Sequence, residues 1–570
     1  MCQVGEDYGG PGPAELQPKL PWRGCEQKCM KCKEGLPVLI IRAGDAFCKD
    51  CFKAYYIHKF RAMLGKNRLI FPGEKVLLAW SGGPSSSSMI WQVQEGLSRE
   101  SAKRLRFVPG VIYVDEGAVC GQSLEERAKT VAEMKLILQT VGFPYHIVSL
   151  EEVFNLPASV LQPVSQGPQG PENTYKEAVD GFIQQQQRLP EEGGQEAALS
   201  DELRRLSTRD PVGPEEAAGD SLPRPAQSTA LTTLFSSVKT LTAKEELLQT
   251  LRAHLILHTA RLHGYSKVML GDSCTRLAIK LMTNLALGRG AFLAWDTGFS
   301  DDRHGDVVLL RPMRDYTLKE IAFYNRMFGV PSVFTPAIDT KAPEKASIHR
   351  LMESFILRLQ AQFPSTISTV YRTSEKLVKA PRNGGAAGPV PTRCLLCMCT
   401  LDIDSADSAT AFGAQTLEHL SQKPTPPPGA PGRPCCTRGT ELPRACCRGP
   451  QPASQREEPR ASFIEQLCYS CRVNMKDVPF LEPLPPYILT EAQCRRQRIG
   501  EIKPVATGGC GFLLGTLTQI RPSGVPLPSS WPTSSGRAGP REGASWVAWV
   551  KQEIQEFLFE ESEGEDPDGN

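Results

Sequence analysis

The sequence predicts an α/β protein with a doubly wound parallel sheet, flanked on both sides by Cys-rich modules and interrupted by disordered insertions. Short apolar runs of strand length alternate with amphipathic helical stretches between residues 74 and 362, which is typical of a parallel sheet covered by helices. Two Cys-x-x-Cys pairs come before this region and two come after it. Pro, Gly and Gln are concentrated in stretches that show neither the hydrophobic period of a helix nor that of a strand, as expected of segments that cannot bury a core.

The individual elements are predicted from local patterns in chain order. Strands of mostly apolar residues are expected at 76–80, 107–114, 145–150, 267–270 and 307–310. Helices are expected through 89–97 and over 123–141, 242–263, 275–287, 317 onward and 347–362. Three of them start at a capping box, in which Ser or Thr precedes Glu by three residues: Ser123 with Glu126, Thr242 with Glu245, and Thr317 with Glu320. Gly142 marks the end of the helix that starts at Ser123.

Changes in composition divide the chain into parts. Residues 1–24 are expected to be disordered, 25–65 to form a zinc-binding module and 66–380 to form the α/β domain, with a disordered insertion at 156–228. A second Cys-rich module is expected at 390–503, with a disordered insertion at 421–460, and residues 504–570 form a low-complexity and acidic tail. Six apolar residues between 546 and 558 fall on one helical face, as in a docking helix or in a helix packed on the core.

Bulk composition excludes several classes of protein. The formal net charge of +2 gives the chain no overall basic character, and the N-terminal MCQVGEDYGG lacks the apolar segment of a secretory signal. No apolar run reaches the ~18 residues that a membrane span needs. Nineteen Cys in such a chain are better explained by metal binding or redox chemistry than by structural disulfides. We therefore expect a cytoplasmic protein that does not interact with membranes.

The first Cys residues have the spacing of a structural zinc site. Cys29 and Cys32 form one Cys-x-x-Cys pair, and Cys48 and Cys51 form a second pair after fifteen intervening residues. Each pair can direct two thiolates at one tetrahedral ion, and four thiolates leave no position for water. The expected role of the site is to fold a small module. The alternative is a chance pairing of abundant cysteines.

The later Cys residues repeat this spacing. Cys394 with Cys397 and Cys468 with Cys471 form two further pairs. Most of the sequence between them is the Pro-rich insertion, and the entropy of closing a loop grows slowly with its length. A second zinc site is therefore expected, with Cys399 as an alternative ligand. The cysteines between 435 and 447 stay unassigned.

A Gly-Gly pair at the first strand-to-helix turn indicates an anion site. Ser81-Gly82-Gly83 follows the strand at 76–80, and Ser85 and Ser86 stand at the start of the next helix. The glycines let the backbone approach a phosphate, while N–H groups of the turn and hydroxyls face it. Ligands bind at this turn in doubly wound sheets, whereas elsewhere the same residues would indicate only a flexible loop. The turn is not a Walker loop, because the Gly-Lys-Ser/Thr ending is missing.

Basic and aromatic residues are interleaved after the first Cys module. The basic members are Lys53, His58, Lys59, Arg61, Lys66 and Arg68, and the aromatic members are Tyr55, Tyr56 and Phe60. Cations neutralise phosphates and rings stack on unpaired bases, so the pattern suits tRNA binding, for which Lys59, Arg61, Lys66 and Arg68 are the candidates. A solvated helix face with core aromatics explains the same short stretch equally well.

Together these motifs resemble the PP-loop ATP pyrophosphatases of the tRNA-thiolating branch, a family with the adenine nucleotide α-hydrolase-like fold. The resemblance covers about residues 25–155, 229–420 and 461–503. Its parts are the Ser81-Gly82-Gly83 loop, residues 115–117 and 241–245, a second nucleotide-facing segment at 271–276 and 281–285, and a later element with Arg311-Pro312-Met313 and Lys319-Glu320-Ile321. It implies nucleotide contacts at Ser81, Gly82, Gly83, Ser85, Ser86 and Gly271, and flanking zinc modules are typical of this branch.

Departures from the family pattern imply that the chemistry is lost. Active members read Ser-Gly-Gly-x-Asp-Ser, and Ser85 stands where the Asp serves metal and phosphates; a hydroxyl is a far poorer Mg²⁺ ligand than a carboxylate. Two acids of a second motif are replaced by Thr275 and Arg276, and no Cys lies between Cys120 and Cys274, where active members place one before the long helix. The nucleotide contacts are therefore interpreted as vestigial. Cys274 is either a relocated nucleophile with a lowered pKa or a small buried side chain.

The resemblance implies a subunit of a cytosolic tRNA 2-thiolation complex. With a catalytic PP-loop partner, it would put sulfur from a thiocarboxylated ubiquitin-like carrier onto the wobble uridine (mcm5s2U34) of tRNA Lys, Gln and Glu, while the complex uses ATP and Mg. The chain itself would be a structural and tRNA-binding subunit with zinc as cofactor and no catalysis of its own. Two alternatives stay open: an enzyme that adenylates and thiolates tRNA by itself, and a zinc-dependent adaptor that binds only proteins.

Overall fold

The computed structural model describes the ordered core of the chain. The described residues are 28–41, 45–98, 104–162, 175–179, 184, 224–363, 365–377, 393–401, 460, 462–476, 478 and 480–501. The chain divides into two compact units, residues 1–494 and 495–570, and of the second unit only 495–501 are described. The helical face expected at 546–558 and the cysteines between 435 and 447 lie outside the described residues.

The core contains a mixed, mostly parallel sheet of six strands in the order β5-β4-β3-β6-β8-β7. The strands are β3 (Lys75–Ala79), β4 (Val108–Asp115), β5 (Tyr145–Ser149), β6 (Lys267–Leu270), β7 (Ser300–Asp301) and β8 (Val308–Leu310). All neighbours are parallel except β7 and β8, which are antiparallel. The order runs outward in both directions from β3 and β6, as in a doubly wound sheet. A separate small sheet pairs β1 (Leu39–Ile40) with β2 (Ala46–Phe47).

Helices cover both faces of the six-stranded sheet. The helices of the described residues are α1 (Lys49–Asn67), α2 (Pro84–Leu97), α3 (Leu124–Val141), α6 (Pro225–Ser237), α7 (Leu241–Leu262), α8 (Cys274–Ala286), α9 (Leu293–Thr297), α10 (Leu318–Phe328), α11 (Ile348–Gln362), α12 (Thr366–Glu375), α15 (Tyr469–Met475) and α16 (Pro486–Glu501). Short 3-10 turns lie at η1 (Leu150–Asn155), η2 (Ala158–Leu161), η3 (Gly290–Phe292) and η4 (Glu344–Ala346). None of the described helices is both long and apolar enough to span a membrane.

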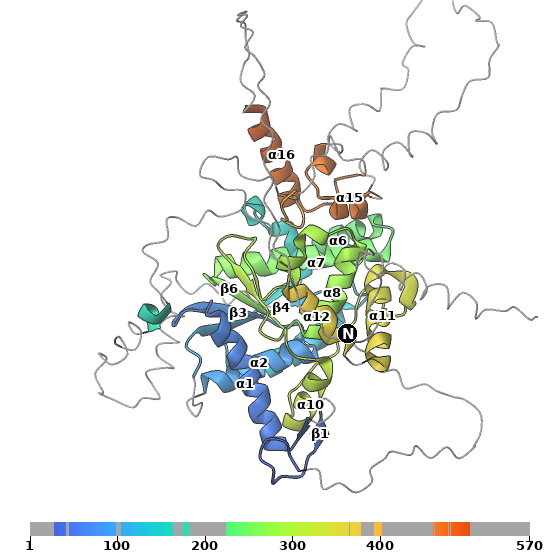
Figure 1. Cartoon of the computed structure of the whole chain (residues 1–570). Coiled ribbons are helices and arrows are strands. Elements are labelled where there is room, and N and C mark those ends of the chain that lie inside the picture. The colour runs from blue at the N-terminus through green and yellow to red at the C-terminus, as the bar shows by residue number, and fades with distance from the viewer. Residues whose placement is uncertain are drawn as a thin grey trace, which may run out of the picture. The chain divides into compact units, whose positions relative to one another are not determined.

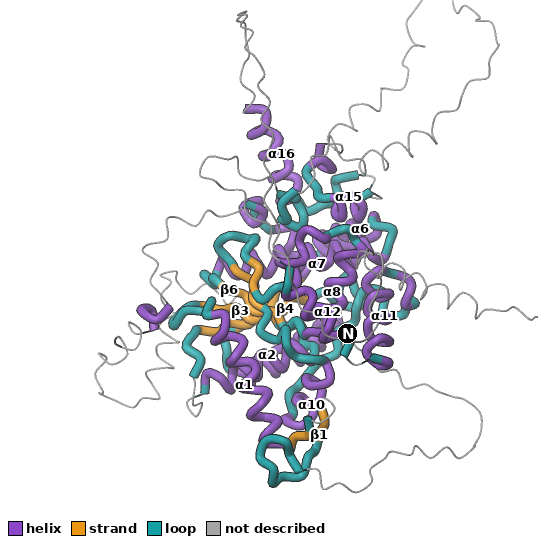
Figure 2. The backbone as a smooth tube through the Cα atoms, in the orientation of Figure 1, coloured by secondary structure: helices purple, strands orange, loops and turns teal. Residues whose placement is uncertain are grey.

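Alternate residues of β3 face two separate hydrophobic cores. Val76 and Leu78 pack with apolar residues of α1, α2, α3 and α10, whereas Leu77 packs with those of α7 and of the second Cys module. Figure 1 shows α1, α2 and α10 on one side of the sheet and α6, α7 and α15 on the other. In Figure 2 the strands lie between these two groups of helices. The sheet therefore separates the surroundings of the two Cys modules.

Both Cys modules share these cores instead of having cores of their own. Phe47 and Phe52 of the first module belong to the same buried cluster as Leu78. Leu395 and Phe463 of the second module belong to the cluster that contains Leu77. The boundaries expected near residues 65 and 385 therefore do not separate independent cores.

Two predicted boundaries need correction. The insertion expected at 156–228 is too wide, because residues 158–161 form η2, where Val160 is buried, and α6 begins at Pro225. The cap expected at Thr242 is wrong. Thr240 caps α7 by accepting a hydrogen bond from the Ala243 N–H at 3.2 Å, while the Thr242 hydroxyl accepts one from the Ile348 N–H at the start of α11.

Candidate functional site

The Gly-Gly loop lies where the strand order of the sheet reverses (Figure 1). It connects β3 to α2, and the neighbouring strand β6 brings Gly271 against it. A Cβ atom on Gly271 would lie 2.7 Å from the Cα atom of Ser86, so only glycine allows this approach. Gly82 has a φ angle of +78°, which glycine adopts without strain. The structure therefore brings the predicted nucleotide-binding residues Ser81, Gly82, Gly83, Ser85, Ser86 and Gly271 to one place.

Most serine hydroxyls of this loop are engaged within the protein. The hydrogen bonds join Ser86 Oγ to Gly83 O at 3.0 Å, Ser87 Oγ to Trp80 Nε1 at 3.0 Å, and Ser88 Oγ to Tyr56 Oη at 2.7 Å. Of the four consecutive serines, only Ser85 makes no side-chain hydrogen bond within the described part of the chain, and it is half-buried. The loop thus keeps few hydroxyls for an anion.

Residues from other elements hold the loop in place. The Val333 N–H donates to Gly82 O at 2.9 Å, and Asn325 Nδ2 of α10 donates to Pro84 O at 2.9 Å. Met134 of α3 covers Gly82, because a Cβ atom there would lie 2.5 Å from Met134 Cε. A side chain at position 82 would therefore disturb packing before it changed any chemistry.

The start of α8 offers no group suited to metal binding or nucleophilic attack. Thr275 is fully buried, and its hydroxyl has no hydrogen-bond partner among the described residues. Cys274 is also buried, and burial, followed by the charge of Glu320, raises the pKa of its thiol to about 12. A thiol that stays protonated at neutral pH is a weak nucleophile. The geometry therefore favours the buried-side-chain interpretation of Cys274.

The Arg311-Pro312-Met313 element also serves the interior. Arg311 is buried, and its NH1 group donates to Trp295 O and to Gly298 O at 2.9 Å each. Its Nε atom lies 3.4 Å from Asp272 Oδ2. Although burial raises the pKa of the Asp272 carboxyl, the charges of Lys280 and Arg311 hold it below its usual range. Arg311 thus neutralises a carboxylate and satisfies backbone carbonyls.

Acidic residues at the end of β4 are bound to arginines. Arg127 Nε donates to Asp115 Oδ2 at 2.9 Å, and its two NH groups donate to the carboxylate of Glu151 at 2.7 and 3.0 Å. Arg252 makes a second two-pronged contact, with Glu116. Sequence reasoning singled out residues 115–117 only through the family resemblance. Their geometry is that of a structural ion network.

The first group of four cysteines fits a single metal ion. The Sγ atoms of Cys29, Cys32, Cys48 and Cys51 all lie within 4.8 Å of one another, and those of Cys32 and Cys48 are 3.9 Å apart. An ion bound at about 2.3 Å by four tetrahedral sulfurs needs about 3.8 Å between sulfurs. An iron–sulfur cluster attaches its cysteines to different irons and spreads the sulfurs further. Although burial opposes the shift, backbone N–H donors lower the pKa of Cys29 to about 6.

The second group of four cysteines has the same geometry. The Sγ atoms of Cys394, Cys397, Cys468 and Cys471 all lie within 4.8 Å of one another, and those of Cys397 and Cys468 are 3.6 Å apart. Cys399, the alternative ligand, does not belong to this group. Its sulfur instead accepts a hydrogen bond from Arg303 NH1 at 2.9 Å.

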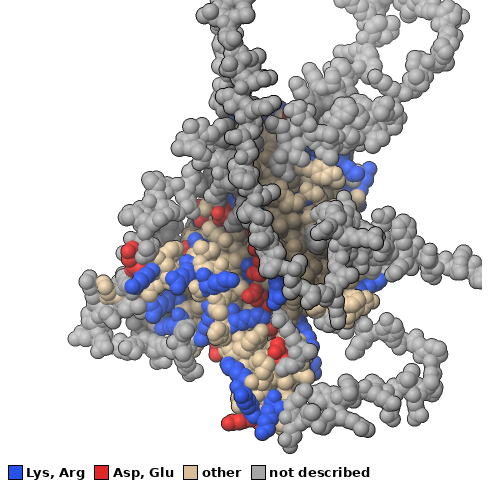
Figure 3. Space-filling view, in the orientation of Figure 1, with Lys and Arg blue, Asp and Glu red and all other residues tan. Residues whose placement is uncertain are grey.

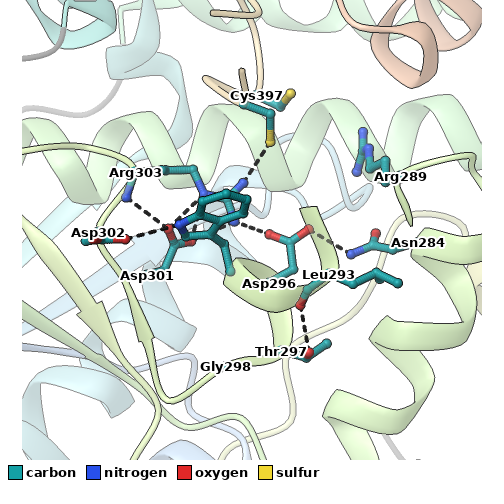
Figure 4. Close-up of polar contacts among 12 residues, drawn as sticks. Asn284, Arg289, Leu293, Asp296, Thr297, Gly298, Asp301, Asp302, Arg303 and Cys397 are labelled. Atoms are coloured by element: carbon teal, nitrogen blue, oxygen red, sulfur yellow. Dashed lines mark hydrogen bonds and ion pairs between the residues drawn. The ribbon is translucent and has the colours of Figure 1, made fainter. Parts of the chain in front are cut away.

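Two arginines beside the second group were missed by sequence reasoning. Arg303 is held by Asp296 and by both carboxylate oxygens of Asp301, as Figure 4 shows, and its NH1 group donates to Cys399, two residues after Cys397. Arg289 NH2 lies 3.9 Å from Cys471 Sγ. Four thiolates around a divalent ion would leave an excess of negative charge, which the Arg289 guanidinium beside Cys471 would offset. Spacing could not reveal these residues, since they lie 96 and 182 positions from the cysteines they contact.

A buried histidine also holds the second group. His254 Nε2 donates to Leu396 O, between Cys394 and Cys397, at 2.8 Å, while its Nδ1 accepts from Tyr487 Oη at 2.6 Å. These two bonds fix a neutral tautomer, and burial lowers the pKa of His254 to about 4. His254 therefore anchors the turn of the Cys394–Cys397 pair to α7.

The basic residues of α1 do not form one surface. Lys59 Nζ lies 2.7 Å from Glu320 Oε1 and is largely buried, so the expected contact between Lys59 and tRNA needs correction. Arg61 is half-buried, whereas Lys66 and Arg68 are exposed. Tyr56 and Phe60 are buried in the core, which agrees with the alternative interpretation of the pattern. Four other lysines of the first Cys module are exposed: Lys28, Lys31, Lys33 and Lys49. Figure 3 shows Lys and Arg side chains gathered around α1 and β1.

Comparisons with known proteins give a consistent result. A family model for cytoplasmic tRNA 2-thiolation protein 2 matches residues 347–473, which include the second group of cysteines. Proteins of that name from Homo sapiens and Rattus norvegicus are 70% and 69% identical to this chain, over 87% of it and 96% and 93% of their own lengths. The Danio rerio protein is 52% identical over 88% of this chain and 97% of its own length. These names agree with the predicted cytoplasmic location.

A solved structure is also similar in part. The U34-tRNA thiolase NcsA from Methanococcus maripaludis with its 4Fe–4S cluster matches 64% of this chain and 91% of that chain, at 15% identity and a TM-score of 0.38. A likeness at this level supports no inference about function.

Proposed function

Because the chain belongs to the cytoplasmic tRNA 2-thiolation protein 2 family, we propose that it is a supporting subunit of a tRNA 2-thiolation complex and has no catalysis of its own. A catalytic PP-loop subunit would use ATP and Mg²⁺ to activate the wobble uridine of tRNA Lys, Gln and Glu. Sulfur would arrive as the thiocarboxylate of a ubiquitin-related carrier. The chain would complete the tRNA-binding surface and stabilise its partner.

The residues present in the Gly-Gly loop and at the start of α8 carry this proposal. The glycines that shape the turn are present: Gly82 has a left-handed φ and Gly271 packs on Ser86. The groups that would perform the chemistry in active family members are replaced. Ser85 offers a neutral hydroxyl where a metal would need a carboxylate, and at the start of α8 Thr275 is sealed in the interior. These observations support a chain that keeps the fold without the reactive groups.

The two groups of cysteines support a structural role. Each fits one tetrahedral ion, and we propose zinc, which closes such sites and contributes directly to folding. The first site would hold β1 and β2 to the start of α1, because Cys48 and Cys51 lie at that helix start. The second would join two segments on either side of residue 420. Exposed Lys66 and Arg68, with the lysines of the first module, would then meet the tRNA phosphates.

Two measurements on purified protein test the proposal. The chain alone, given tRNA, ATP and Mg²⁺, should release no pyrophosphate above background, whereas the complex with its catalytic partner should release it. Crosslinking within the complex should attach tRNA to this chain. Pyrophosphate release by the chain alone would establish a self-sufficient enzyme instead. Active thiolation without any tRNA crosslink to this chain would establish a protein-binding adaptor.

A further inference from the structure

A hollow of about 300 Å³ lies between α1, α2 and α10. Three aromatic side chains line it: Trp91, Tyr324 and Phe328. Lys53, Gln94 and Glu95 add polar groups to its wall. Two of these helices connect the hollow to features described above, since α1 starts at the first Cys module and α2 starts at the Gly-Gly loop. The hollow is separate from the proposed metal sites and from the loop.

The aromatic wall of the hollow is anchored in the hydrophobic core. The Tyr324 ring stacks on the Tyr56 ring with 4.1 Å between centroids and 8° between planes. The Phe328 ring lies 4.9 Å from Tyr324 and is tilted, with 44° between the two ring planes. Tyr56 is fully buried and is hydrogen-bonded to Ser88, so the stack is fixed from its inner end. A flat ligand that joins its outer end would not have to order these rings.

Positive charge lies at the rim of the hollow. The Nζ atoms of Lys49 and Lys53 lie over the Phe328 ring, at 5.7 and 5.8 Å from its centroid, as cation–π contacts. Lys53 also pairs with Glu95 at 3.6 Å, in a contact that leaves both side chains well exposed. Figure 3 shows further Lys and Arg side chains around α1 and β1. An anionic group bound at the rim would therefore meet a local excess of cations.

Flat apolar faces, hydrogen-bonding groups at one edge and cations at the rim are the features that single-stranded RNA needs. We propose that this hollow binds one unpaired base of the RNA substrate, stacked on the aromatic wall, with its phosphate near Lys49 and Lys53. This inference rests on the proposed function, because it takes RNA as the substrate. Gln94 Nε2 already donates to Val141 O at 3.2 Å, so the Gln94 carbonyl oxygen and the Glu95 carboxylate on the wall would serve as acceptors for donors of the base edge. The volume is at the small end of ligand sites, which suits one base.

The test uses the full-length protein and a short single-stranded RNA that carries one 2-aminopurine. Binding should quench the 2-aminopurine fluorescence, because the base stacks on aromatic rings. Phe328→Leu should weaken binding by roughly 5- to 150-fold, the range for loss of one base–aromatic stack, and should abolish quenching. Phe363→Leu is the matched control, since Phe363 is an exposed ring at the end of α11 and should bind as the wild type does. Lys53→Gln should reduce the slope of log K against log salt by about 0.7.

The outcomes separate this inference from the proposed function. RNA binding by the wild type without quenching, or equal affinities of the Phe328→Leu and Phe363→Leu variants, would overturn the base site and leave the tRNA-binding subunit intact. Equal affinity for the free 2-aminopurine riboside would assign the hollow to a small molecule instead. Failure of the chain and of its complex to bind any RNA would overturn both. If circular dichroism shows Phe328→Leu to be unfolded, Trp91→Leu replaces it.

Discussion

Arg127 is the centre of a buried ion network, and its removal should destabilise the protein strongly. Its guanidinium lies 2.8 Å from Asp115 and 2.7 Å from Glu151, which is fully buried. Arg127→Met keeps much of the apolar stem and leaves two carboxylates without a counter-ion. Removing one partner of a buried pair costs about 3–5 kcal/mol. Hydrogen bonds from the Gly117 N–H and the Ser228 hydroxyl remain, so we expect a loss of about 3 kcal/mol.

The loss is measured as the free energy of unfolding in urea, followed by circular dichroism. Arg358→Met is the matched control, because Arg358 pairs with Glu344 at 2.9 Å in a contact that leaves both side chains about half exposed. An exposed pair contributes at most about 1 kcal/mol. A loss below 1 kcal/mol for Arg127→Met, or an unchanged stability together with lost thiolation, would refute the structural role of the acids at the end of β4.

Three further results are expected. Elemental analysis should find two zinc ions per chain, and the double variant Cys397→Ser with Cys468→Ser should retain one; two ions in that variant would contradict the second site. Lowering the pH from 6.5 to about 4 should reduce the free energy of unfolding by about 3 kcal/mol through His254. Burial lowers the pKa of His254 in the folded protein to about 4, so the unfolded chain takes up the proton first. The contribution of His254 to stability is complete above about pH 6.5, and the His254→Gln variant should not show this pH-dependent loss. Identical urea titrations of the wild type and the variant across this pH range would argue against a buried neutral His254. Gly82→Ala should cost at least about 1–2 kcal/mol from its +78° φ alone, and more because Met134 must move; a variant as stable as the wild type would show that the loop is not held this way.

Much of the fold could be predicted because its signals are local. The capping boxes at Ser123 and Thr317 are present, and Gly142 ends α3 in a left-handed conformation. Other features are decided by distant contacts. Thr240 and Thr242 both suit a helix start, and the contact of Thr242 with α11 selects Thr240 as the cap. Strand β7 has two polar residues, too few to show any period.

The candidate sites show the same division. Four-cysteine spacing is a local signal, and the structure brings both sets of sulfurs together. Burial and long-range pairing have no local signal. Lys59 stands in a basic stretch of the sequence, yet its partner Glu320 lies 261 positions away. Cys274 stands at a helix start, where a lowered pKa is expected, but burial in the core reverses the direction. The charge of a side chain can be read from the sequence, whereas its exposure depends on the whole fold.

Sulfur transfer by the reconstituted complex tests most directly whether this chain takes part in the chemistry. The double variant Ser81→Ala with Ser85→Ala removes the two least buried hydroxyls of the loop and leaves the glycine turn intact. Gly82→Asp is less suitable, because Met134 occupies the space for its side chain. We predict that the double variant thiolates tRNA at a rate within about twofold of the wild type, a change of less than 1 kcal/mol in the barrier. A loss of about 100-fold or more, with complex assembly and tRNA binding intact, would show that the loop is catalytic.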